Sequence, residues 1–248
     1  MNKYINSTMI SGVAATVLLT AIVPASFARD YYVGVAGGAS FLTVKNDGTY
    51  TYDDNVFGAP DQSDKSATGS ASGAVGEIYL GLATQPMDRF YLATELNITG
   101  LTGSANTEYS DEYTTQATTS YDSKVNYAAG ISVLPGYVVS DKTLLYTRVG
   151  INYTQFQSIA AETNTSVFES SIKESVVAYR LGLGVDQFIR SSNFSLRIEG
   201  DYWGFNKVNK SGVSALGAEL NQDFQPSIIT GLVGLTYHFG AQSDTTSK

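Results

Sequence analysis

Residues 90–99 read FYLATELNIT and display the pattern that decides how this chain folds. Apolar residues and one threonine occupy every second position from Phe90 to Ile98, whereas the positions between them carry small or polar residues, including Glu95. A period of two places these sets on opposite faces of a β-strand. About ten residues is the length of a tilted strand that crosses a membrane. The stretch therefore predicts a membrane-spanning strand with one apolar face and one polar face.

Seven further segments alternate in the same way, and they lie at residues 31–41, 77–82, 126–133, 145–153, 179–186, 196–203 and 229–239. Their polar faces are rich in glycine and hold charges in mid-strand, whereas their apolar faces carry no charge. A water-soluble sheet would bury its apolar face and expose its charges, but here the charges belong inside a closed ring and the apolar residues outside. We therefore predict an all-β fold, a transmembrane antiparallel β-barrel of eight strands. Ten strands are the alternative, because residues 48–57 could add a hairpin.

The connections between these segments alternate in length. The short ones are residues 85–88, 140–142 and 190–193, and the long ones are residues 45–72, 101–123, 157–173 and 207–225. The long segments are rich in Ser, Thr, Asn, Asp and Gly, which is typical of surface loops. Short periplasmic turns and long extracellular loops are typical of bacterial outer-membrane barrels.

The N-terminus has the layout of a secretory signal peptide. Lys3 precedes an apolar stretch at residues 13–23, and Ser26-Phe27-Ala28 supplies small residues for cleavage after Ala28. A permanent N-terminal anchor is the alternative, but the apolar stretch is short for a membrane span. We predict a signal peptide at residues 1–28, a barrel at residues 29–240 and a short polar tail at residues 241–248.

Composition excludes several classes of protein. The chain has no cysteine, so it has neither a disulfide framework nor a thiolate metal site. Its formal charge of −8 argues against nucleic acid as a partner, because nucleic-acid binding requires clustered Lys and Arg. After the signal peptide, no run of about 18 apolar residues predicts a transmembrane helix.

Three short motifs resemble those of small outer-membrane barrels. Residues 234–240, GLTYHFG, resemble the closing strand of the OmpA transmembrane domain and of OmpX-type proteins, and residues 31–34, YYVG, resemble their opening strand. Residues 196–202, LRIEGDY, resemble the seventh strand. The resemblance implies a Gram-negative outer membrane, with Tyr237 and Phe239 forming a signal that the barrel-assembly machinery reads. The polar tail is too short for the peptidoglycan-binding domain of full-length OmpA.

Eight charged residues fall on the polar, lumenal face by parity: Glu77, Glu95, Arg148, Arg180, Asp186, Arg197, Glu199 and Asp201. One register of the last tight hairpin places Asp186 opposite Arg197, and a register shifted by two residues places Arg180 opposite Asp201. Side chains nearly fill the interior of an eight-stranded barrel, and buried charges there require partners. We predict a charge network that plugs the lumen, with a gated ion pathway as its rival.

These features predict a non-enzymatic structural and surface-interaction protein of the adhesion or envelope-integrity type. Its predicted partners are outer-membrane lipid, lipopolysaccharide, the barrel-assembly machinery, and a host or envelope protein bound through the long loops. A small diffusion pore is the alternative. A lipid-modifying barrel enzyme is a distant third, because it would depend on the single histidine, His238, and the chain has no G-x-S-x-G motif. No cofactor is expected.

Overall fold

The computed structural model of the protein describes residues 29–51, 62–110, 118–163, 170–190, 192–213 and 219–239. The predicted signal peptide with its cleavage site at Ala28, and the tail at residues 241–248, lie outside these residues. No helix among the described residues is long and apolar enough to cross a membrane. The strands are β1 (Arg29–Thr51), β2 (Gln62–Met87), β3 (Phe90–Leu101), β4 (Ser104–Ser110), β5 (Thr118–Ser140), β6 (Thr143–Thr163), β7 (Ser170–Phe188), β8 (Phe194–Phe205), β9 (Val208–Val213) and β10 (Glu219–His238).

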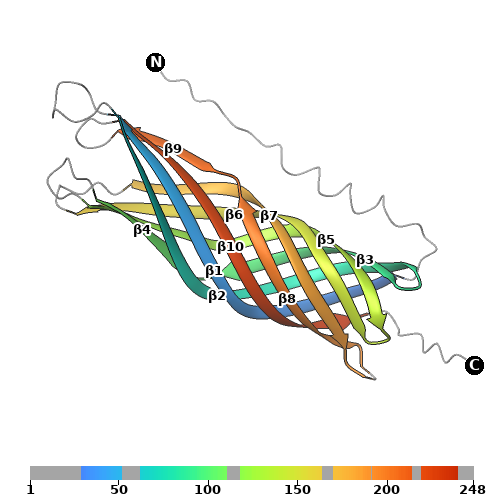
Figure 1. The fold of residues 1–248 in the computed structure, drawn as a ribbon. Helices are drawn as coiled ribbons and strands as arrows, with labels where there is room; N and C mark the ends of the chain where they lie inside the picture. Colours follow the sequence, from blue (N-terminus) through green and yellow to red (C-terminus); the bar gives the residue numbers. More distant parts are fainter. Residues whose placement is uncertain are drawn as a thin grey trace, which may run out of the picture.

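Eight of these strands close into an antiparallel ring (Figure 1). The ring runs β1-β2-β3-β5-β6-β7-β8-β10, and β10 pairs with β1 from His238 opposite Tyr32 to Glu219 opposite Thr51. β4 follows β3 and pairs with β5, whereas β9 follows β8 and pairs with β10. The eight-stranded barrel is therefore confirmed. Of the residues 48–57 considered for an extra hairpin, those up to Thr51 continue β1, and residues 52–57 lie outside the described residues.

The strands are much longer than predicted, and the segments expected to be long loops are for the most part strand. β1 has 23 residues and β2 has 26, and their ladder extends to Thr51 opposite Gln62. β5 and β6 likewise remain paired up to Thr118 opposite Thr163. The prediction of loops was wrong here because Ser- and Thr-rich segments also form strands when they continue an existing ladder.

The polarity of the two faces inverts along a single strand. In β1, Val35 and Phe41 point outward and are exposed. Beyond Phe41 the inward residues Leu42 and Val44 are buried, and Lys45 points outward. On the side of Phe41 that carries the short turns, the outer surface of the barrel is apolar, as contact with lipid requires. On the other side of Phe41 the outer surface is polar, as contact with water requires. The inversion marks where the barrel leaves the membrane, and the unchanged period of two lets the strand continue through it.

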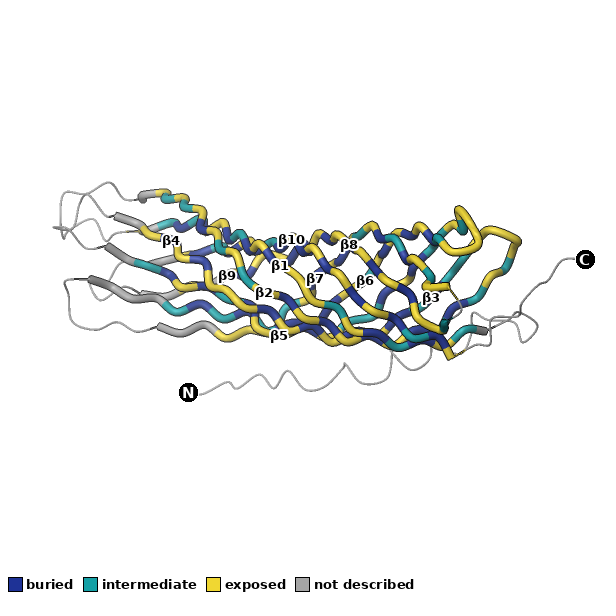
Figure 2. The backbone as a smooth tube through the Cα atoms, turned by 90° about the horizontal axis from the view of Figure 1, so that it is seen from below, coloured by how far each residue is buried: buried dark blue, intermediate teal, exposed yellow. Residues whose placement is uncertain are grey.

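Exposed aromatic side chains lie at two levels of the outer surface. Those near the short turns are Tyr31, Phe90, Tyr137, Phe194 and Phe239, and those near the polarity inversion are Phe41, Tyr127, Tyr153 and Tyr202. Figure 2 shows exposed and buried residues alternating along the strands between these levels. Aromatic rings at both interfaces are typical of membrane barrels. Phe205, by contrast, is buried inside the barrel, where three consecutive residues at the end of β8 are enclosed.

Cross-strand pairs of tyrosine and glycine lock neighbouring strands together. The pairs are Tyr79 with Gly34, Tyr32 with Gly81, Tyr146 with Gly184, and Tyr179 with Gly204. Each tyrosine ring lies where a side chain on the opposite glycine would stand, so that a Cβ at Gly184 would lie 2.2 Å from the ring of Tyr146. Glycine is therefore required there for close approach of the ring to the opposite backbone.

The substitution Gly184→Val is expected to destabilise the folded barrel by about 1–3 kcal/mol, because the ring of Tyr146 is enclosed and has little room to move. Gly76→Val is the matched control, since a Cβ at this outward-facing glycine would meet no atom within 4 Å. Urea unfolding in detergent micelles measures both variants. Equal stability of the two would show that the tyrosine–glycine contact does not constrain the barrel.

Candidate functional site

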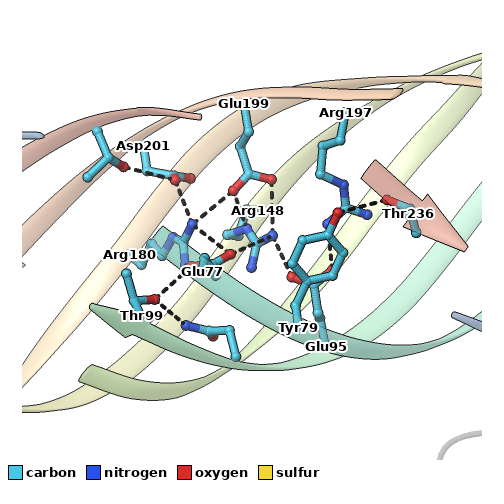
Figure 3. Close-up of polar contacts among 12 residues, drawn as sticks. Glu77, Tyr79, Glu95, Thr99, Arg148, Arg180, Arg197, Glu199, Asp201 and Thr236 are labelled. Atoms are coloured by element: carbon cyan, nitrogen blue, oxygen red, sulfur yellow. Dashed lines mark hydrogen bonds and ion pairs between the residues drawn. The ribbon is translucent and has the colours of Figure 1, made fainter. Parts of the chain in front are cut away.

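All eight charged residues that parity assigned to the lumen point into the barrel and are at most 4% exposed. They come from five strands, with Glu77 on β2, Glu95 on β3, Arg148 on β6, Arg180 and Asp186 on β7, and Arg197, Glu199 and Asp201 on β8. Figure 3 shows most of them gathered in one cluster across the barrel. The alternation of strand faces thus brings together residues more than a hundred positions apart.

Two arginines share their carboxylate partners at the centre of the cluster. Arg148 lies 2.5 Å from Glu95 and 2.8 Å from Glu199. Arg180 lies 2.5 Å from Glu77 and 3.0 Å from Glu199. Glu77 also stands 4.0 Å from Arg148. Removal of one arginine would therefore affect several carboxylates at once.

Both of the ion pairs proposed for the last tight hairpin occur, although only one of the two registers does. Asp186 is the direct neighbour of Arg197, with 3.0 Å between their charged atoms. Arg180 stands opposite Trp203 in the ladder, yet its guanidinium reaches diagonally to Asp201 at 2.7 Å. Diagonal neighbours on one face of a sheet are within reach of long side chains.

Each of the five carboxylates also accepts a hydrogen bond from a hydroxyl group. The donors are Tyr32 to Glu95, Tyr146 to Glu199, Thr99 to Glu77, Thr230 to Asp201 and Ser195 to Asp186, over 2.5–3.2 Å. A buried ionic cluster is tolerated only when nearly all its groups are paired. These hydroxyls were not among the residues singled out from sequence, because Ser, Thr and Tyr are too common to signal a partner.

Aromatic rings enclose the cluster on its periplasmic side. The guanidinium of Arg197 lies 4.4 Å from the ring centre of Tyr79 and 5.2 Å from that of Tyr146, at distances typical of cation–π contacts. The two tyrosines belong to a buried cluster with Tyr32, Ala83, Ala93, Leu134 and Leu144.

An apolar cluster lies on the extracellular side of the charges. It is built from inward residues beyond the outer aromatic level, among them Val44, Phe156, Trp203 and Phe224, and these four are fully buried. Arg180 lies 5.0 Å from the ring centre of Trp203 and marks the boundary between the charged and apolar layers. This layer was not predicted from sequence, because Val44 and Phe156 lie beyond the ends of the predicted strands at residues 31–41 and 145–153, and Phe224 lies in a predicted loop. The signal was present in the apolar inward residues that follow the polarity inversion.

His238 has the hydrogen-bonding connectivity of a hydrolase triad. Its Nδ1 lies 2.6 Å from Asp30, and its Nε2 lies 3.1 Å from the hydroxyl of Ser195. Ser195 is 0% exposed, however, and its hydroxyl donates to the carboxylate of Asp186, which is paired with Arg197. The hydroxyl has a single proton, so a serine that donates to Asp186 is not activated by His238. The arrangement connects β1, β7, β8 and β10 and is not a reactive nucleophile.

No group of three or more His, Asp or Glu residues in the described ranges could hold a metal ion.

The aromatic residue that follows the last strand lies on the outer surface of the barrel. Phe239 follows β10, is 59% exposed on the outer surface, and packs edge-on against Tyr237 with ring centres 4.9 Å apart. Its N–H donates to the carbonyl of Tyr31 at 2.7 Å.

Polar contacts organise the outer surface above the membrane. The hydroxyl of Ser66 and the ammonium of Lys45 both contact Asp47, at 2.6 and 2.9 Å. The hydrogen bond from Ser66, followed by that from Lys45, lowers the pKa of Asp47 below its ordinary value. Thr49 and Asp64 form a second contact across β1 and β2 at 2.9 Å. These contacts hold the two strands together where no lipid surrounds them.

A closed ring with an apolar outer belt, two aromatic levels and a charged interior defines an outer-membrane β-barrel. Residues 27–243 match the family model of the OmpA-like transmembrane domain. The chain belongs to this family, and its location is the outer membrane.

The chain is also similar to solved outer-membrane proteins at low sequence identity. The attachment invasion locus protein Ail of Yersinia pestis, solved with the heparin analogue sucrose octasulfate, is 14% identical over 82% of this chain and 99% of its own, with a TM-score of 0.34. Neisserial surface protein A is 11% identical over 82% and 97%, with a TM-score of 0.38. The outer-membrane protease OmpT of Escherichia coli is 10% identical over 85% and 97%, with a TM-score of 0.44. No curated protein matches the chain. Identities this low transfer none of these activities.

Proposed function

We propose that the protein is a non-enzymatic surface-interaction barrel, of the adhesion or envelope-integrity type, whose lumen is closed. The observation that carries the closed lumen is the apolar cluster stacked on the charged one. An ion that entered along the arginine and glutamate side chains would next meet Val44, Phe156 and Phe224, whose side chains offer no polar group to replace its water. This arrangement favours a plugged scaffold over a diffusion pore.

The extracellular strands support the role in surface interaction. β1, β2, β5, β6 and β10 all continue beyond the outer aromatic level, with polar residues outward and apolar residues inward. They form a rigid, water-soluble extension of the barrel. We propose that this extension meets a host or envelope protein and lipopolysaccharide.

Processing and assembly complete the proposal. The signal peptide is cleaved after Ala28, and the barrel-assembly machinery reads Tyr237 and Phe239 on the last strand. The outward position of Phe239 supports this reading, because a signal for another protein must be accessible before the ring closes.

Deletion of residues 48–65 tests the surface role. Gly48 and Lys65 are register partners, so the deletion shortens β1 and β2 equally and preserves the ladder below them. The deletion variant is expected to keep the heat-modifiable migration of a folded barrel and to lose binding to immobilised host matrix proteins or lipopolysaccharide. A binding profile identical to that of the intact protein would refute the assignment of binding to this hairpin.

A further inference from the structure

The wall of the barrel is interrupted at one place above the membrane. Among the described strands, the wall runs β9-β10-β1-β2-β4-β5-β6-β7 in that region. β2 and β4 share no ladder among the described residues, but they lie close together, since a Cβ at Gly69 of β2 would lie 2.2 Å from the carbonyl oxygen of Asn106 of β4. By contrast, no ladder in the described ranges joins β9 to β7.

A β-bulge explains why β9 separates from β7. The β7–β8 ladder ends where Ala178 stands opposite Phe205. Along β10, Ser227 pairs with Gly204 and Phe224 pairs with Val208, so residues 205–207 stand opposite only two residues of β10. One of these two is Pro226, which has no N–H to donate. An extra residue bends a strand away from its former course, and β9 continues beside β10 alone.

The separation leaves two strand edges without ladder partners among the described residues. The N–H of Phe188 donates to the carbonyl of Lys142, on the β6 side, and the N–H of Ile189 donates to the carbonyl of Phe194, on the β8 side. Backbone groups of a strand alternate in direction. The odd-numbered residues of β7 therefore point their N–H groups toward β8, and above Ala178 those at 173, 175 and 177 point into the gap. A row of backbone N–H groups of this kind forms hydrogen bonds with the backbone of another strand.

The side chains around the gap indicate what kind of strand fits. Phe205 and Val208 are buried on the inner face, and Val176 is half-buried. Lys173 is exposed on the outer face of β7, and Lys207, whose ammonium stands 3.9 Å from the carboxylate of Asp223, is exposed beside β9, with 57% of its side chain accessible. A strand in the gap would rest apolar residues on the inner face and bring acidic residues beside the two lysines.

We propose that the gap between β7 and β9 is a receptor for an extended segment of another protein, with alternating apolar and acidic residues, which completes the wall by β-strand addition. This inference rests on the proposed surface role and names the class of partner for it.

The probe is a synthetic nine-residue peptide in which valine alternates with glutamate and threonine, labelled for fluorescence anisotropy. The protein is the full barrel in lipid nanodiscs. Ser175→Pro removes one N–H that points into the gap and keeps the ladder with β6, because proline is tolerated at a strand edge. Ser175→Thr is the matched control. We expect the peptide to bind the intact protein and Ser175→Thr alike, and to bind Ser175→Pro about tenfold more weakly.

Absence of peptide binding to the intact protein would overturn the inference, as would equal binding by a folded Ser175→Pro variant. Self-association that Ser175→Pro abolishes in the absence of peptide would also overturn it, since the edge would then serve a second copy. Deletion of residues 48–65 leaves β7 intact, so its effect on surface binding tests the proposed function separately. Heat-modifiable migration verifies that each variant is folded.

Discussion

Replacement of Arg180 by alanine is expected to destabilise the barrel by about 3–5 kcal/mol, the largest effect among the charged residues. Among the described residues, Arg180 is the only guanidinium within ion-pair distance of Asp201 and one of two within that distance of Glu199. Its removal would leave at least one carboxylate buried without a cation. Urea unfolding in micelles, followed by the fluorescence of the single tryptophan, measures the change.

Lys45→Ala is the control for this prediction. Lys45 also forms an ion pair, with Asp47, but half of its side chain is exposed, so the expected loss is under about 1 kcal/mol. A second variant separates charge from packing, since Arg180→Met with Asp201→Leu removes both charges and should recover part of the stability. A loss for Arg180→Ala as small as that for Lys45→Ala would mean that the cluster does not brace the barrel.

Trp203→Ala is expected to lower the free energy of unfolding of the barrel by about 3–5 kcal/mol. Trp203 is fully buried between the charged and apolar layers, and its removal leaves a cavity that neighbours on different strands cannot fill. Tyr202→Ala is the control, because Tyr202 points to the outer surface and is 43% exposed. Urea unfolding of both variants is followed by circular dichroism, because Trp203→Ala removes the single tryptophan and with it the fluorescence signal. Similar urea midpoints of unfolding for the two variants would contradict a packed apolar layer.

The fold could be predicted because one pattern repeats eight times. Alternation along residues 90–99 assigns Glu95 to the interior without knowledge of any other strand, and the same argument assigns Arg148 and Glu199. Register could not be predicted, because shifts of two residues preserve every face. The ion pairs of Asp186 and Arg180 therefore remained alternatives until the ladder was known.

The extracellular half was predicted poorly for a physical reason. A strand in water and a strand in lipid have the same period, but the faces exchange polarity. Around Phe41 that exchange resembles the end of a strand, and the inward residues Leu42 and Val44 were left outside the predicted strand at residues 31–41. Contacts such as those of His238 with Asp30 and Ser195 depend on which strands meet at the closing seam, and no local pattern specifies them.

Single-channel conductance of residues 29–248, refolded into a planar lipid bilayer with insertion verified independently, tests the closed lumen most directly. The charged cluster covered by the apolar layer predicts an inserted barrel that remains electrically silent. Reproducible conductance steps that change in the Arg148→Ala variant would contradict the closed lumen and assign the protein to the diffusion pores.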